Sequence, residues 1–183
     1  MVRSIIFDLY GVLAVDGWQA FESTHFTDHD VLDQVFQLRR QVDAGLSDYA
    51  ELVRLAAEAI GENEETVRYQ LEHTALNTNL LELIHRDLLG RYKLGILSNA
   101  SNKEVIKRFF TLEQQQLFDV IMLSHDVGVS KPDVQLYELM AEKLDVSVET
   151  CLFIDDSERH VIGARDAGMQ ALLYTIWQVL ERI

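Results

Sequence analysis

Four places along the chain carry side chains that could do chemistry together. They are Asp8, the pair Ser98 and Asn99, Lys131, and the pair Asp155 and Asp156. Adjacent carboxylates repel each other unless a cation lies between them, and a hydroxyl and a lysine both suit an anionic ligand. Carboxylate oxygens are the ligands that hard divalent cations prefer. The residue types therefore predict a Mg²⁺ site with a phosphate group beside it.

Each of these places follows a stretch that has the pattern of a buried strand. Apolar runs predict strands at 92–97, 118–123, 151–155 and 170–174, and a further strand that ends before Asp8. After Gly90 these runs alternate with helical patterns, which is typical of parallel βα units. Ligands of such sheets bind beyond the carboxyl ends of the strands, so we expect the four places to lie at one edge.

A helical insertion separates the first strand from the others. The apolar spacing changes to a helical period at about residue 16, and Gly61 and Gly90 each stop one helix. We expect Ser47 to begin a helix and Asn63 to cap the next one. The predicted fold is α/β, a Rossmann-like parallel sheet flanked by helices, with an inserted all-α cap. The predicted domains are 1–15 with 89–183 for the core and 16–88 for the cap.

Three further segments carry structural signals. Ser101-Asn102-Lys103-Glu104 has the form of a capping box, and Pro132-Asp133 has the form of a helix start. We expect the apolar run from Ile176 to Leu180 to dock on the sheet.

Composition narrows the class of protein. A chain of 183 residues with 48% hydrophobic and 25% charged residues is long and apolar enough for one compact core with a modest insertion. The net charge of −14, without a basic patch, argues against nucleic acid as a partner. The single cysteine, Cys151, allows no intramolecular disulfide. No segment has the ~20 apolar residues of a membrane span, so we expect a cytoplasmic protein with no membrane partner.

In order and spacing, the motifs resemble those of the haloacid dehalogenase-like hydrolase superfamily. They are Asp8 with Gly11-Val12-Leu13, then Leu94 to Asn99, then Ser130-Lys131-Pro132-Asp133, and finally Phe153-Ile154-Asp155-Asp156-Ser157. The resemblance covers nearly the whole chain. The stretch 42–49 is also similar to the cap of the branch that includes sugar-phosphate phosphatases and the N-terminal domains of epoxide hydrolases.

The resemblance implies a nucleophile and a metal site. Asp8 would attack phosphorus and form an aspartyl-phosphate, which water then hydrolyses. Mg²⁺ would lie between Asp8, the backbone carbonyl of Tyr10 and Asp155, with Asp156 in support.

It also implies a binding site for the phosphoryl group. Ser98 and the amide of Asn99 would hold phosphoryl oxygens, and Lys131 would neutralise the charge that develops on them. The function implied is Mg²⁺-dependent hydrolysis of a small phosphorylated metabolite, a small-molecule phosphoester. We expect a monomer or a weak homodimer.

Tyr10 departs from the family pattern. Family phosphatases usually carry a second aspartate at this position, which acts as general acid and later activates water. A phenol with a pKa of about 10 can donate a proton, so Tyr10 is a candidate catalytic residue, but it is a poor base at neutral pH. Three alternatives are therefore open: a phosphatase that works without that acid, a 2-haloacid dehalogenase, or a protein that binds without catalysis. Two tyrosines favour a dehalogenase. The 2-haloacid dehalogenases carry tyrosine at the position of Tyr10, and Tyr137 follows Lys131 at a dehalogenase-like spacing. The pair Asp155 and Asp156 favours a phosphatase, because dehalogenases need no metal and carry serines there.

Two further residues have roles that the pattern leaves open. His160 lies behind the acidic pair, where it either bonds Asp155 or Asp156 or faces solvent as a helix histidine. Asp16, in the loop that leads into the insertion, could supply the missing acid. Trp18, Phe21 and Phe26 could touch a substrate, although core packing is the prediction. The remaining histidines lack the ligand spacing of a zinc site.

Overall fold

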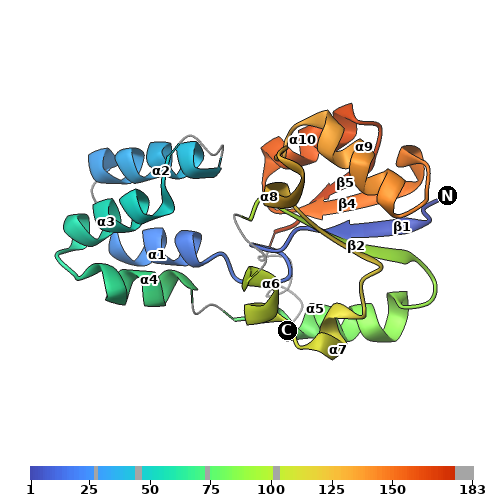
Figure 1. The fold of residues 1–183 in the computed structure, drawn as a ribbon, viewed down its shortest axis with the longest axis horizontal. Coiled ribbons are helices and arrows are strands. Elements are labelled where there is room, and N and C mark those ends of the chain that lie inside the picture. Colours follow the sequence, from blue (N-terminus) through green and yellow to red (C-terminus); the bar gives the residue numbers. More distant parts are fainter. Residues whose placement is uncertain (27–28, 44–46, 73–74, 101–103, 176–183) are drawn as a thin grey trace. The chain divides into compact units, whose positions relative to one another are not determined.

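A computed structural model describes residues 1–26, 29–43, 47–72, 75–100 and 104–175 (Figure 1). The chain divides into two compact units, of which one contains Met1–Ala14 and Leu76 onward, and the other Val15–Ala75. Three predictions fall wholly or partly outside the described residues: the cap-like stretch at 42–49, the capping box at 101–104 and the apolar run at 176–180.

The first unit is built on a parallel sheet. In the described residues its strands are β1 (Ser4–Phe7), β2 (Lys93–Ser98), β3 (Val120–Leu123), β4 (Cys151–Asp155) and β5 (Gln170–Leu173), in the order β3-β2-β1-β4-β5. Phe7 is level with Ile96 on one side and Ile154 on the other. Because the strands are parallel and in this register, the residues that follow them emerge at one edge. The predicted Rossmann-like α/β sheet is confirmed.

Helices cover both faces of this sheet (Figure 1). Ile6 faces a cluster with α9 (Val134–Lys143) and α10 (Glu158–Asp166). Ile5 and Phe7 face the opposite cluster, which includes side chains of α5 (Thr78–Leu83), the π-helical turn η1 (Ile84–Leu88) and α6 (Glu104–Phe109). Successive side chains of a strand point to opposite faces, so a strand covered on both sides is mostly apolar, and β1 is buried along its whole length with three apolar residues after Ser4.

Short elements complete the unit: α7 (Leu112–Gln115), α8 (Ser124–Val127) and the 3₁₀ turn η2 (Val148–Thr150). The predicted helix start at Pro132-Asp133 is confirmed, since the Asp133 carboxylate accepts a hydrogen bond from Gln135 N at 2.9 Å. Helix α7, which was not predicted, has a reciprocal capping box between Thr111 and Gln114.

The second unit is helical in its described residues, with α1 (Gly17–His25), α2 (His29–Asp43), α3 (Tyr49–Ile60) and α4 (Glu64–Glu72). Gly61 ends α3 in the left-handed conformation with φ 71°, as predicted. Asn63 accepts from Thr66 N at 2.8 Å and so caps α4, also as predicted. The cap of α3 is Asp48, one residue after the predicted start. Phe21 is buried among the apolar side chains of this unit, which confirms the packing role.

The helical insertion is shorter than the predicted 16–88. Leu81 and Ile84, which we expected in the cap, are buried in the cluster that contains Leu9 and Ile96. The division therefore falls after Ala75. A helical period shows which side of a helix is apolar, but it does not show which neighbour that side packs against. In the part of the chain that the structure describes, no helix combines the length and apolarity needed to cross a bilayer.

Candidate active site

Asp8 follows β1 directly and lies almost wholly inside the protein, with 6% of its surface exposed. Its backbone N–H donates to Ile154 O at 2.9 Å, which continues the pairing with β4 past the end of the strand. Its Oδ1 lies 2.8 Å from Lys131 Nζ. Burial raises the pKa of the Asp8 carboxyl well above its usual range; the Lys131 charge lowers it, and the Asp155 charge raises it. A further cation would therefore favour the ionised, nucleophilic form.

Lys131 is buried between two carboxylates. Its Nζ lies 2.8 Å from Asp8 Oδ1 and 2.6 Å from Asp155 Oδ2. Burial alone would lower the pKa of this ammonium, but the two carboxylates outweigh burial and raise it. The lysine therefore carries its positive charge where a phosphoryl group would bring negative charge.

The main chain of Lys131 is held by the side chain of Asn99. Lys131 N donates to Asn99 Oδ1 at 2.8 Å, and Asn99 Nδ2 donates to Lys131 O at 3.0 Å. The peptide between Lys131 and Pro132 is cis. Asn99 was predicted from its strand-end position, but this reciprocal pair was not, because it joins residues 32 positions apart.

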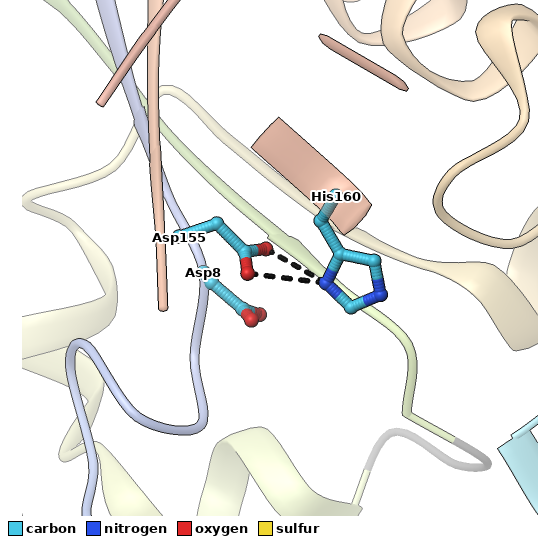
Figure 2. A group of neighbouring side chains, drawn as sticks. All are labelled: Asp8, Asp155 and His160. Carbon is cyan, nitrogen blue, oxygen red and sulfur yellow. Dashed lines mark hydrogen bonds and ion pairs between the residues drawn. The ribbon is translucent and has the colours of Figure 1, made fainter. Parts of the chain in front are cut away.

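Asp155 ends β4 and is fully buried. Ser157 N donates to its Oδ1 at 2.8 Å, Lys131 contacts its Oδ2, and His160 Nδ1 lies 3.1 Å from both oxygens (Figure 2). Burial would raise the pKa of this carboxyl, but Lys131 and His160 outweigh burial and hold the pKa well below its usual range. Donor atoms of Asp8, Asp155 and His160 all lie within 4.8 Å of one another.

Asp156 lies against the loop that follows Asp8. A Cβ built on Gly11 would be 2.1 Å from Asp156 Oδ2, and Gly11 has a φ of 82°. Only glycine combines that backbone conformation with room for the carboxylate. The two adjacent aspartates thus have different surroundings: Asp155 contacts the lysine, and Asp156 contacts the loop after β1.

Ser98 ends β2 with 1% of its surface exposed. Among the residues that the structure describes, its Oγ has no hydrogen-bond partner. A buried hydroxyl without a partner costs free energy, and Ser98 lies at the edge of the sheet where the other predicted site residues follow their strands. Its O–H could donate a hydrogen bond to a ligand oxygen at this edge of the sheet.

The model of the haloacid dehalogenase-like hydrolase family matches residues 5–174. The chain belongs to this family. The matched residues include all four of the motif places described above. The fold and the site therefore agree with the resemblance that the motifs indicated.

Two relatives of this haloacid dehalogenase-like hydrolase carry phosphatase names. Phosphatase MT3486 of Mycobacterium tuberculosis (strain CDC 1551 / Oshkosh) is 35% identical over 137 residues, which are 74% of this chain and 57% of the relative. The phosphorylated carbohydrates phosphatase of Thermotoga maritima is 28% identical over 110 residues, which are 60% of this chain and 51% of the relative. The chain thus spans little more than half the length of the relatives it matches.

Solved structures share the fold. A family enzyme from Bacteroides thetaiotaomicron, in complex with magnesium and inorganic phosphate, superimposes with a TM-score of 0.68 at 23% identity, covering 98% of this chain and 99% of that one. The L-2-haloacid dehalogenase of Xanthobacter autotrophicus superimposes with a TM-score of 0.70 at 18% identity, covering 100% and 82%. The fold alone therefore does not separate a phosphatase from a dehalogenase.

Tyr10 and Tyr137 of this hydrolase both pack against apolar core residues, and only Tyr137 is fully buried. The Tyr10 ring meets Phe109 edge-on with centroids 5.8 Å apart. Tyr137 is fully buried, and its hydroxyl donates to His160 O at 2.8 Å. Tyr137 is therefore enclosed by the core, and its hydroxyl is bonded to the main chain of α10.

Asp16 belongs to the helical unit. Its Oδ1 accepts from Trp18 N at 2.9 Å, and its Oδ2 lies 2.5 Å from an Arg39 nitrogen. A second nitrogen of Arg39 lies 3.7 Å from Glu22 Oε1. Both oxygens of Asp16 thus contact its own unit, and the role of substitute acid stays a prediction.

Proposed function

We propose that the protein is a Mg²⁺-dependent phosphomonoester hydrolase that acts through an aspartyl-phosphate on Asp8. The observation that carries the proposal is the buried Asp8 carboxylate beside Lys131, at the carboxyl edge of a parallel sheet. Ser98, whose Oγ has no hydrogen-bond partner among the described residues, ends a strand at the same edge. The phosphatase names of the relatives support the same activity.

The residues present fit a divalent cation. Asp8 and Asp155 have donor atoms within 4.8 Å of one another, and the Asp156 carboxylate lies against the loop that follows Asp8. The Asp155 oxygens are engaged by Lys131, Ser157 and His160, so we assign the ion to Asp8, Asp156 and the Tyr10 carbonyl, with Asp155 contributing charge. When bound, Mg²⁺ screens the repulsion between the nucleophile and the phosphate and polarises the phosphoryl group.

The chain's own groups then perform the displacement. An Asp8 oxygen attacks phosphorus, a new O–P bond forms, and the bond to the leaving oxygen breaks. The leaving group departs as its anion and takes a proton from water. Ser98 donates to one phosphoryl oxygen, and Lys131 offsets the charge that spreads over the others. Water attacks the aspartyl-phosphate in the second step, releases phosphate and regenerates the Asp8 carboxylate.

Position 10 shapes the expected substrate range. The Tyr10 ring packs against Phe109, so we assign it no acid role and give it only its main-chain carbonyl. General acids contribute about 10²–10⁴-fold to rate, mostly for poor leaving groups. Small phosphorylated metabolites with good leaving groups are therefore the preferred substrates. Residues 15–75 are assigned the role of a cap that selects among them.

The test is phosphate release from a panel of aryl, acyl, sugar and alkyl phosphates, with Mg²⁺ and with EDTA. Asp8→Asn, which keeps the shape of the side chain, is the matched control. Release that requires Mg²⁺ and is lost in Asp8→Asn supports the proposal. No release from any ester in the wild type contradicts it.

The tyrosine at position 10 favours one second candidate, a 2-haloacid dehalogenase. In that reaction Asp8 would attack carbon and expel halide, and the ester would then be hydrolysed by water. Chloride release from 2-chloropropionate in the presence of EDTA would support this candidate.

A further inference from the structure

We propose that His160 is a positioning residue, whose imidazole N–H holds Asp155 in the orientation that keeps Lys131 beside Asp8. The hydrogen bond between His160 and Asp155 and its effect on the place of Lys131 are inferred from the contacts of these residues alone. The effect of His160 on turnover rests on the proposed function, so the experiments below separate the two.

The imidazole of His160 donates a hydrogen bond to Asp155. Its Nδ1 lies 3.1 Å from both Asp155 oxygens, and an ionised carboxylate can only accept hydrogen bonds. The proton must therefore be on Nδ1, which makes His160 the donor and Asp155 the acceptor. Figure 2 shows the ring with this nitrogen toward Asp155.

The hydrogen bond from His160 helps to fix the orientation of the Asp155 carboxylate. Three donors hold the carboxylate: Ser157 N on Oδ1 and His160 across both oxygens, from the start of α10, and Lys131 Nζ on Oδ2. Asp155 is fully buried, so water has no ready access to replace a lost donor. Removing the imidazole leaves one side of the carboxylate without a donor and lets the oxygen that binds Lys131 turn away.

His160 is itself held in place, because its helix α10 packs against two neighbouring segments. Tyr137, fully buried in α9, donates its hydroxyl to His160 O at 2.8 Å, and its ring packs edge-on against Phe153. Helix α10, which carries His160, also packs closely against the segment that contains Lys131 and Pro132. A Cβ built on Gly163 of α10 would lie 2.5 Å from Pro132 O. The helix that carries His160 is therefore anchored both to α9 and to the segment that carries Lys131.

The functional consequence follows from the position of the ammonium. Lys131 Nζ contacts both Asp8 and Asp155, so a shift of Asp155 moves the charge away from the nucleophile. Small misplacements of a charged group in a site can cost about 100-fold in rate. His160 would thus affect turnover without touching the substrate.

The direct test compares His160→Asn with His160→Leu. The Asn side-chain nitrogen takes the place of Nδ1 and can donate to Asp155, whereas Leu has similar branching and no donor. The readout is the ¹⁵N–¹H signal of the Lys131 ammonium, assigned with Lys131→Arg. We expect the slowly exchanging signal in the wild type and in His160→Asn, and its loss or displacement in His160→Leu. An unchanged signal in His160→Leu would overturn the proposal.

Kinetics and metal binding provide the second readout. At saturating Mg²⁺, His160→Leu should lose about 10–100-fold in kcat with KM within threefold, and His160→Asn should recover most of that loss. Equal losses in both variants, with equal losses of Tm, would indicate a structural role and overturn the positioning role.

A weaker Mg²⁺ Kd in His160→Leu, with full kcat at saturation, would identify His160 as a metal ligand instead. If the wild type hydrolyses no phosphoester, the proposed function fails, and the ammonium signal still decides the role of His160.

Discussion

Each unit contains a cluster of one basic residue and two carboxylates, and the two clusters differ in burial. In the α/β unit, the side chains of Lys131, Asp8 and Asp155 are 1%, 8% and 0% exposed. In the helical unit, the corresponding values for Arg39, Asp16 and Glu22 are 24%, 12% and 17%. Charges that water cannot screen interact strongly, so the first cluster can alter reactivity, whereas the second mainly links α1 to α2.

The largest expected difference between the clusters comes from removing the cation. Lys131→Met should lower kcat by about 10²–10³-fold and the free energy of unfolding by about 3–5 kcal/mol, because two buried carboxylates lose their partner. Arg39→Met should change kcat by less than about threefold and cost about 1 kcal/mol. Steady-state kinetics and chemical denaturation measure both. An equal loss of kcat in Arg39→Met would place the second cluster in the active site.

The second prediction concerns two glycines with left-handed backbone. Gly11→Ala should place a methyl group where the Asp156 carboxylate lies, while at Gly61 a Cβ meets nothing within 4 Å. Gly61→Ala should cost about 1–2 kcal/mol from backbone strain and leave catalysis unchanged. Gly11→Ala should cost more and also weaken Mg²⁺ binding, as measured by calorimetry. Equal effects of the two substitutions would contradict the assigned place of Asp156.

Removing the Ser98 hydroxyl should affect catalysis without lowering the stability of the fold. Ser98→Ala removes a buried hydroxyl that has no partner among the described residues, so Tm should stay the same or rise. If that hydroxyl binds the phosphoryl group, kcat/KM should fall by about 10²-fold. A lowered Tm with normal kcat/KM would show that Ser98 serves the fold.

The smallest expected effect is a pH dependence in the helical unit. Burial raises the pKa of the Glu22 carboxyl; the Arg39 charge lowers it, and the Asp16 charge raises it. The folded state then holds this proton more tightly than the unfolded state, so ionisation of Glu22 costs stability as pH rises above the unfolded pKa of about 4.3. Glu22→Gln should therefore gain Tm relative to the wild type between pH 4 and pH 7. A constant difference across that range would contradict this.

Much of the fold was predictable because strand and helix periods are local signals. Burial on both faces gives β1 its apolar run from Ile5 to Phe7, and Gly61 and Asn63 mark helix ends by their own backbone and side-chain chemistry. The segment 76–88 was assigned to the wrong unit, since its helical period is the same whichever core it packs against. The site was predictable as a set because parallel strands bring their carboxyl ends together.

The sequence by itself determined the α/β class, the place of the helical insertion, and the set of side chains at the edge of the sheet. These follow from the hydrophobic period, from the succession of predicted strands and helices along the chain, and from residue chemistry. Each of these signals can be recognised in short stretches of sequence. Only the tertiary structure decided how Asp155 and Asp156 divide between the lysine and the loop, that Asn99 holds the backbone of Lys131, and that Tyr137 is buried behind His160. Those contacts join residues distant in the chain, and they depend on atomic distances that residue types alone do not specify.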